Sequence, residues 1–292
     1  MSQPTENRQV DRAAAAAGTG RGQSSRRGAD RPSRSKPRKQ QSKGWVPNQH
    51  GAWAMLVVPY LAGAIWQLRW HELSPVLVAL FLAWIVAYFA FFAASQWLKA
   101  RRKERYQQAL LTYSVAAAVL IVVVLLLKPA WWSWGLVFAP LTAVSLYLAA
   151  TKRERSTVSG LLTVLAASLL PIVLGSDGLW RLGDLPDVAA ISAACFGYFF
   201  GTVLYVKTNI RERGRRSWLI ASVLWHAAWT VIAFFLPVVG GIWLSLLFAV
   251  LTIRALVVPQ LGPRWGIKVR PVHLGVSEIV VSVVLLLLLS LA

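Results

Sequence analysis

The stretch Pro47-Asn48-Gln49-His50-Gly51-Ala52-Trp53 marks the point at which this chain changes from a polar to an apolar sequence. Before it lie residues 1–43, which are rich in Ser, Arg, Gln, Gly and Pro and show no sustained apolar period. After it, nine apolar segments continue almost to Ala292. A helix needs about 20 apolar residues to cross a hydrocarbon core about 30 Å thick. The sequence therefore predicts an all-α polytopic membrane protein.

The composition of the chain agrees with this fold class. Apolar residues make up 57% of the 292 residues, charged residues make up 14%, and the mean hydropathy is +0.54. A soluble fold would have to bury all nine segments in one core, and the sequence offers no polar faces to cover it. The predicted transmembrane helices are 50–68, 75–98, 108–127, 132–150, 157–175, 187–207, 217–236, 242–260 and 275–292.

The net charge of +20 is distributed as in a membrane protein, not as on a nucleic-acid-binding face. Four loops on the same side as the N-terminus hold 16 Lys and Arg residues, whereas the opposite loops hold Arg69, Lys128 and Arg181. Basic residues concentrate in the cytoplasmic loops of membrane proteins. We therefore expect the N-terminus in the cytoplasm, the C-terminus outside, and no nucleic-acid partner.

Residues 1–43 are predicted to form a disordered basic cytoplasmic tail, and residues 44–292 the transmembrane helical domain. The tail carries 11 basic residues, and its polar composition cannot bury enough apolar surface to offset the entropy of ordering. No short apolar region follows it at the distance expected of a cleavable signal peptide. Contact with anionic membrane lipid is the simplest role for this tail, and a specific binding partner is the alternative.

Several residues carry expectations about packing. Pro59 and Pro171 fall within spans and predict kinks that open space in the bundle. The single cysteine, Cys195, excludes an intramolecular disulfide. His226, in the middle of the seventh span, is interpreted as a hydrogen-bonded packing residue. Four tryptophans are expected at the outer edges, where amphipathic rings prefer the headgroup level: Trp131, Trp132, Trp134 and Trp180.

Polar side chains at membrane depth are costly and usually face a cavity or a partner. In this chain they gather at the cytoplasmic ends of the spans, and the free N–H groups at the start of the first helix suit an anion. At each position an ordinary helix cap or a solvated topology signal is the competing interpretation. The predicted ligand-binding residues are Asn48, Gln49, Trp53, Gln96, Lys152, Lys207, Asn209, Arg211, Arg213, His273 and Glu278.

Three of the inner residues invite a chemical interpretation. His50 and Glu212 are the acid–base candidates, because a histidine changes charge near neutral pH and a carboxylate exchanges protons readily. Glu278 lies about one turn inside an apolar run, so its carboxylate requires a cation nearby. Arg254, His273 and the arginines after the sixth span are the candidates. A structural ion pair is favoured over catalysis at this position.

The sequence has no motif of a nucleotide-binding enzyme, a zinc protease or a serine hydrolase. On the predicted inner side after the tail, the acidic residues are Glu104, Glu154, Glu212 and Glu278. A Mg²⁺–diphosphate site built from several carboxylates therefore lacks its ligands. We predict no cofactor and no metal, and whether the protein is an enzyme is left open.

Two motifs resemble those of the YwiC-like family of bacterial integral membrane proteins. One is the stretch from Pro47 to Trp53, followed by Pro59 and Gly63, and the other is Lys207-Thr-Asn-Ile-Arg-Glu-Arg-Gly214. The resemblance covers the chain from about Trp45 to its end. It implies a multi-pass protein of the bacterial plasma membrane and no established activity.

The predicted topology is also similar to that of the UbiA superfamily of intramembrane prenyltransferases, which are nine-helix bundles with the N-terminus inside. Tyr147 and the following Lys152-Arg153 resemble the Tyr…Lys-Arg motif after their fourth helix. Their two Asp-rich motifs would fall after the second and sixth spans, where this chain has basic residues and no Asp. The resemblance therefore implies the bundle but not the metal-dependent reaction.

The preferred hypothesis is a UbiA-like bundle that binds an anionic lipid or isoprenoid diphosphate at its cytoplasmic face, with the tail of the ligand between helices. Lys152, Lys207, Arg211 and Arg213 would hold the phosphate in place of a metal. A transporter-like protein is one alternative, and it predicts polar residues throughout the bilayer and an inverted repeat. A non-catalytic membrane scaffold anchored by the tail is another. The oligomeric state is left open.

Overall fold

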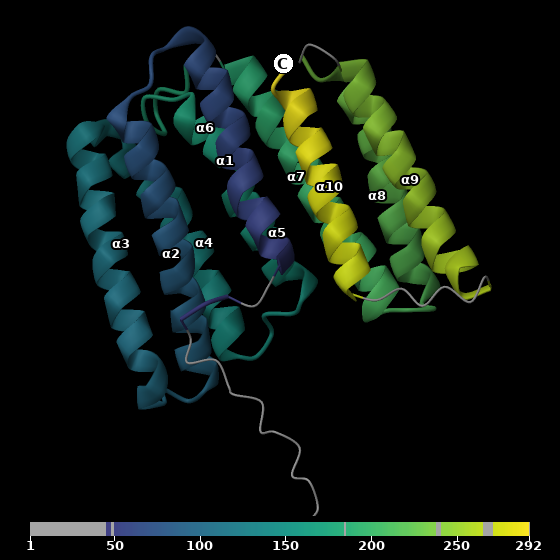
Figure 1. Cartoon of the computed structure of the whole chain (residues 1–292), viewed down its shortest axis with the longest axis horizontal. Coiled ribbons are helices and arrows are strands. Elements are labelled where there is room, and N and C mark those ends of the chain that lie inside the picture. Colours follow the sequence, from purple (N-terminus) through teal and green to yellow (C-terminus); the bar gives the residue numbers. More distant parts are fainter. Residues whose placement is uncertain (1–44, 48–49, 184, 238–240, 265–270, 292) are drawn as a thin grey trace, which may run out of the picture. The chain divides into compact units, whose positions relative to one another are not determined.

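The chain folds as a bundle of long helices (Figure 1). This computed structural model describes residues 45–47, 50–183, 185–237, 241–264 and 271–291, and these residues form helices, turns and loops without a strand. The predicted tail at residues 1–43 lies outside them. The elements are α1 (His50–Trp70), α2 (Pro75–Lys99), η1 (Glu104–Tyr106), α3 (Gln107–Leu127), η2 (Pro129–Trp134), α4 (Gly135–Ala150), α5 (Thr157–Ser168), α6 (Leu170–Leu174), α7 (Leu185–Ile210), α8 (Arg216–Phe235), α9 (Gly241–Arg264) and α10 (Pro271–Leu289).

Eight stretches of the described residues are long and apolar enough to cross a membrane, which confirms the predicted class of multi-pass α-helical membrane protein. They correspond to the second to ninth predicted spans. The fourth includes η2, and the fifth is divided into α5 and α6. The first predicted span is α1, which is not one of the eight. Its 21 residues are about 31 Å long at 1.5 Å per residue, and it packs beside α10.

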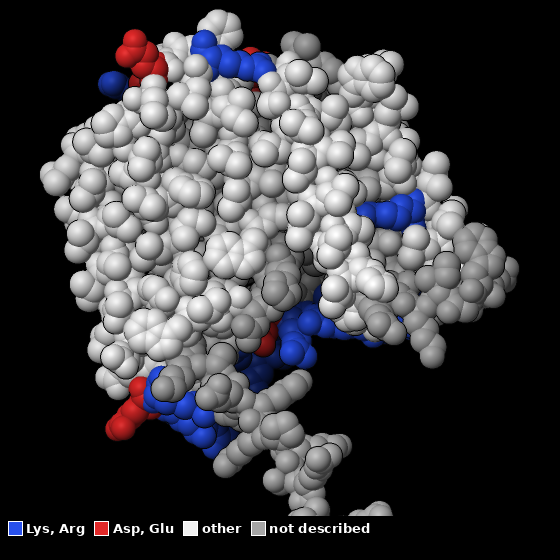
Figure 2. Space-filling view, viewed as in Figure 1, with Lys and Arg blue, Asp and Glu red and all other residues white. Residues whose placement is uncertain are grey.

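Basic loops gather at one end of the bundle. Figure 2 shows most of the Lys and Arg side chains along the lower edge and a broad, almost uncharged band above them. At this end Lys99 of α2 forms an ion pair with Glu154 of the α4–α5 loop, and Arg211 donates to the carbonyl of Arg155 at 3.4 Å. We call this the inner end, after the orientation predicted from the loop charges, and the opposite end the outer end.

Local sequence explains where the helices begin and break. Ser74 caps α2, and Ser156 caps α5 by accepting a hydrogen bond from the Ser159 N–H at 3.1 Å. The predicted kink at Pro171 is confirmed as a break between α5 and α6, whereas α1 continues through Pro59. Gly63 of α1 packs on this break so closely that a Cβ atom there would lie 2.7 Å from the Cα of Pro171.

The most buried of the eight spanning stretches is α7, which packs against α5, α6 and α8. Its glycines Gly197 and Gly201 are one turn apart and receive the side chains of Trp229 and His226 from α8. The Nδ1 atom of His226 lies 2.7 Å from the carbonyl oxygen of Ser222, and the ring is fully buried. This environment agrees with the predicted packing role of His226.

Candidate functional site

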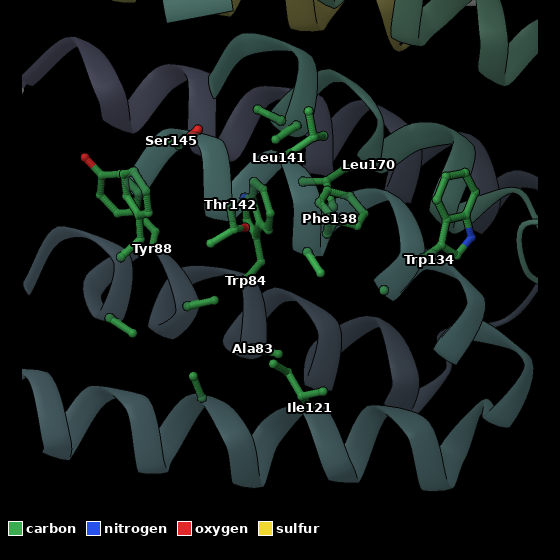
Figure 3. A pocket seen from close by; sticks show the side chains of 18 of the residues that line it. Ala83, Trp84, Tyr88, Ile121, Trp134, Phe138, Leu141, Thr142, Ser145 and Leu170 are labelled. Atoms are coloured by element: carbon green, nitrogen blue, oxygen red, sulfur yellow. The ribbon is translucent and has the colours of Figure 1, made fainter. Parts of the chain in front are cut away.

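A large apolar cavity lies within the part of the bundle formed by α1 to α6 (Figure 3). Its volume is about 790 Å³, which is within the range of small-molecule and cofactor sites. Small residues make room for it along α2, where Ala83, Ala87, Ala90 and Ala94 line the cavity at helical spacing. This spacing is a signal in the sequence that our predictions missed. The polar groups in its wall include the hydroxyls of Tyr88 and Ser145, which lie at the same end in Figure 3.

The outer end of the cavity is closed by two tryptophans. Trp131 donates its indole N–H to the carbonyl of Ser176 at 2.9 Å, and Trp134 donates to the hydroxyl of Ser176 at 3.1 Å. Both side chains are buried, whereas Trp132 and Trp180 are 60% and 74% exposed. Trp131 and Trp134 lie at the outer end of the bundle, as predicted, but their rings are buried against Ser176; the headgroup level of the four rings stays a prediction.

The side of the cavity between α3 and α4 is open. Ala118 and Ile121 of α3 and Thr142 and Ala143 of α4 line it, yet they are exposed on the surface of the bundle. Residues at this depth face the hydrocarbon phase of the membrane. The cavity therefore has a lateral portal, defined by these four residues, toward the bilayer.

The inner end of the cavity is bordered by the start of α1, where Ala52 lines it. The ring of Trp53 lies 6.3 Å from that of Tyr88 and 5.8 Å from that of Phe89, both of α2. Tyr113 of α3 donates its hydroxyl to the carbonyl of Trp45 at 3.0 Å. These contacts hold Trp45, just before the Pro47–Trp53 motif, and Trp53, its last residue, against the α2–α3 hairpin. Asn48 and Gln49 lie outside the described residues, as does the side chain of His50.

The predicted phosphate-binding residues differ in whether their side chains are exposed or already bound to other residues. Lys152 and Arg213 are exposed in inner loops, and Arg211 is exposed beside the α4–α5 loop. Lys207 is buried, donates to the hydroxyl of Thr157 at 2.7 Å, and has its ammonium 4.7 Å from the ring centroid of Trp218. It therefore joins α7 to α5 and α8.

The other inner candidates are spread around this end. Asn209 is buried and donates to the carbonyl of Tyr205 at 2.9 Å, and Glu212 pairs with Arg215 at 2.6 Å. Gln96 is half-buried in the last turn of α2, and His273 is exposed in the first turn of α10. The structure thus brings the α4–α5 and α7–α8 loops together, but it does not bring every candidate into one site.

Glu278 forms a separate polar cluster with residues of α7 and α9. Its Oε1 atom lies 2.7 Å from Nη1 of Arg254, one of the three predicted cation partners, and Thr202 donates to its Oε2 at 2.7 Å. Tyr198 also donates to Oε2 at 3.0 Å, and Ser282 donates to the Glu278 carbonyl at 2.6 Å. The sequence predictions missed Tyr198 and Thr202, which share a face of α7 at a spacing of four residues.

The sequence matches known proteins along most of its length. A model of the YwiC-like protein family matches residues 46–175. The protein YwiC of Bacillus subtilis is 30% identical over 82% of this chain and 93% of its own length. A Haemophilus influenzae protein is 27% identical over 85% of this chain and 98% of its own length. Both relatives are described as uncharacterized, and no solved structure matches.

Proposed function

This chain belongs to the YwiC-like family, and we propose that it binds a long-chain lipid at the inner face of the bacterial plasma membrane. The isoprenoid or acyl chain of the ligand occupies the cavity of α1–α6, and its anionic headgroup reaches the inner basic loops. The observation that carries this proposal is the apolar cavity, which is closed by tryptophans at its outer end and bordered by the start of α1 at its inner end.

The headgroup position follows from the geometry of α4. Leu146 lines the cavity about 6 Å, at 1.5 Å per residue, before Ala150, where α4 ends, and Lys152 lies in the turn that follows. A phosphate attached to a chain in the cavity can therefore reach Lys152 in the α4–α5 loop. Arg211 touches the same loop through the Arg155 carbonyl, and Arg213 is exposed two residues further on. Guanidinium groups pair with phosphate oxygens in a bidentate manner.

The cavity and the headgroup site make different contributions to binding. A lipid that leaves the bilayer for an apolar cavity gains little from the hydrophobic effect, because it was already in hydrocarbon. Shape selection by rigid rings such as Trp84 and Phe138 must therefore decide which chain fits. The charge of the inner loops supplies the attraction for the headgroup, and it weakens with salt.

The proposal is tested by filling the cavity. Ala87→Trp and Ala166→Trp place large side chains in it from α2 and α5, and Ala221→Trp on the exposed face of α8 is the matched control. Binding of labelled polyprenyl diphosphate and of labelled phosphatidylglycerol is measured on the full chain in detergent, with and without Mg²⁺. We expect both cavity variants to lose at least about tenfold in affinity for the ligand that binds, about 1.4 kcal/mol. Equal binding by all three variants, or no binding of either lipid by the wild type, would exclude the proposal.

An acid–base role for His50 or Glu212 is a separate part of this proposal. His50 begins the helix that borders the inner end of the cavity, and Glu212 lies beside the exposed loop arginines. His50→Asn and Glu212→Gln should leave lipid binding unchanged and abolish turnover of a bound diphosphate. Loss of binding in these variants would assign them to the headgroup site instead.

A further inference from the structure

A charged cluster lies at mid-depth in the other half of the bundle, away from the cavity. Arg254 is near the middle of α9, and Glu278 is about two turns into α10. Both side chains are largely buried, with 16% and 7% of their surface exposed. Charged groups in this region of a membrane are expensive and usually mark a site that handles polar ligands or ions.

This cluster has more hydrogen-bond donors than acceptors. Glu278 accepts hydrogen bonds from Thr202 and Tyr198 at Oε2, whereas its Oε1 lies 2.7 Å from Nη1 of Arg254 as an ion pair without the geometry of a hydrogen bond. The three guanidinium nitrogens of Arg254 are buried without a hydrogen-bond partner among the described residues, and of the three it is Nη1 that takes part in the ion pair with Glu278. Each buried donor left without a partner costs about 1–3 kcal/mol. The side chain is held in place, because its guanidinium carbon lies 4.2 Å from the ring centroid of Tyr205.

The unused Nε–Nη2 edge of Arg254 has the shape of a bidentate oxyanion site. Two parallel N–H groups on this edge match the two oxygens of a carboxylate or a phosphate. We propose that Arg254 and Glu278 form a proton-coupled binding site for a small oxyanion, either a carboxylate or a singly charged phosphate. The site lies in α7–α10 and does not depend on the proposed lipid function.

Proton coupling follows from the balance of charge. Without the oxyanion, Arg254 and Glu278 together are neutral. An oxyanion on the Nε–Nη2 edge would leave a net negative charge in a region of low dielectric constant, which is unfavourable. Glu278 therefore releases Nη1 and takes one proton from bulk water onto its carboxylate as the anion binds. The site is then neutral both before and after binding.

Among the groups that meet in this cluster, we assign the proton to the carboxylate of Glu278. From α7 it meets Tyr198 and Thr202, and from α9 it meets Arg254. On α8, His226 is buried and its Nδ1 lies against the Ser222 carbonyl. Among the described side chains of α1, which also packs on α10, the charged one is Arg69, at the outer end on the carbonyl of Ser290.

Access to the site requires α9 and α10 to separate. The cluster is closed toward the inner end by the apolar contacts of Tyr205, Ala255 and Leu274. Between α9 and α10, the ion pair of Arg254 and Glu278 is the polar contact found among the described residues. Because α9 packs mainly on α8, and α10 packs on α1, release of this pair by the anion allows the two helices to part.

The experiment measures anion binding and proton uptake together on the full chain in detergent. Calorimetric titrations with acetate and with inorganic phosphate, in two buffers of different ionisation enthalpy, give the number of protons taken up per anion. We expect at least one of the two anions to bind with uptake of about one proton. For acetate, which stays ionised over this range, the affinity should fall about tenfold per pH unit as the pH rises from about 6 to about 8, and for phosphate, which itself loses a proton near neutral pH, the fall should be steeper.

Variants separate the roles of the two residues. Glu278→Gln is already neutral, so it should bind acetate without proton uptake and independently of pH, and it should bind phosphate with only the pH dependence of the phosphate's own ionisation. The double variant Arg254→Gln/Glu278→Gln leaves no unpaired charge, so it should fold and bind neither anion. Arg181→Gln, in an exposed outer loop, is the charge-removal control and should behave as the wild type. Absence of binding to the wild type, binding without proton uptake, or equal binding by the double variant would overturn the proposal.

Discussion

Gly197 of α7 lies so close to Trp229 of α8 that a Cβ atom on the glycine would be 2.3 Å from the indole ring. One turn further along α7, a Cβ atom on Gly201 would be 2.8 Å from Nε2 of His226. Trp225 donates its indole N–H to the carbonyl of Gly197 at 2.8 Å, which fixes the approach of the two helices. The α7–α8 interface therefore depends on the absence of side chains at these two positions.

Replacing Gly197 with alanine should destabilise the protein by about 1–3 kcal/mol, because the buried ring of Trp229 cannot move away without disturbing the core. Gly275→Ala in α10 is the control, since a Cβ atom at this position would lie in open space, with no packing neighbour within 4 Å. It should stabilise the helix by up to about 1 kcal/mol. Thermal unfolding of both variants in detergent tests this, and equal stability would contradict the packing argument.

Replacing Lys152 with glycine should have opposite effects on stability and on lipid binding. Lys152 has a φ of 60°, in the left-handed region where a side chain costs about 1 kcal/mol. Glycine removes this strain and also removes the charge that we assign to the headgroup. Lys152→Gln removes the charge and keeps the strain, so it should weaken binding without a gain in stability. A glycine variant that is more stable and binds lipid normally would exclude Lys152 from the headgroup site.

Replacing Ser176 with alanine should loosen the outer closure of the cavity. The Trp134 N–H loses its hydroxyl acceptor, and an unsatisfied buried donor costs about 1–3 kcal/mol. In a Trp134→Phe background the same change should cost clearly less, because the donor is already absent. A double-mutant cycle from denaturation free energies measures this coupling. Equal costs in the two backgrounds would show that the bond contributes nothing.

The ion pair of Asp177 and Lys128 in the outer loops should make a small, pH-dependent contribution to stability. The hydrogen bond from Lys128, at 2.8 Å, and its positive charge lower the pKa of Asp177. The contribution is therefore present above the unfolded pKa of about 3.9 and is lost as the pH falls through the lower, folded value. Asp177 is largely exposed, so Asp177→Asn should cost at most about 1 kcal/mol at neutral pH. Unfolding at pH 7 and at about pH 3 should show this difference becoming smaller in acid.

The spans of this protein could be read from its sequence because length and hydropathy alone decide which segments cross a membrane. The predicted range 217–236 nearly coincides with α8, and 75–98 with α2. The pairing of Glu278 with Arg254, one of three candidate partners, could also be anticipated from the sequence, since a buried carboxylate requires a cation. The break at Pro171 followed from the missing N–H of proline.

The cavity and the full polar cluster could not be predicted in the same way, because they depend on which helix faces meet. The alanine spacing along α2 indicates a face of small residues, but Ala87 and Ala94 line a cavity only because α4 and α5 leave space opposite them. The hydrogen bond from Trp134 to Ser176 could not be predicted, since the two residues are 42 positions apart in the sequence. Lys207 was expected to face a ligand, and the structure shows its ammonium bound to Thr157.

The lateral portal between α3 and α4 determines the concentration scale on which the cavity fills with a lipid ligand. A lipid ligand that enters the cavity through the lateral portal, between Ala118 and Thr142, diffuses in two dimensions within the leaflet and does not pass through water. Its saturation is then set by its mole fraction among the surrounding lipids, and diluting the vesicles in buffer will leave it unchanged. Bulk phospholipids or detergent molecules of similar cross-section compete with this ligand for entry at the lateral portal.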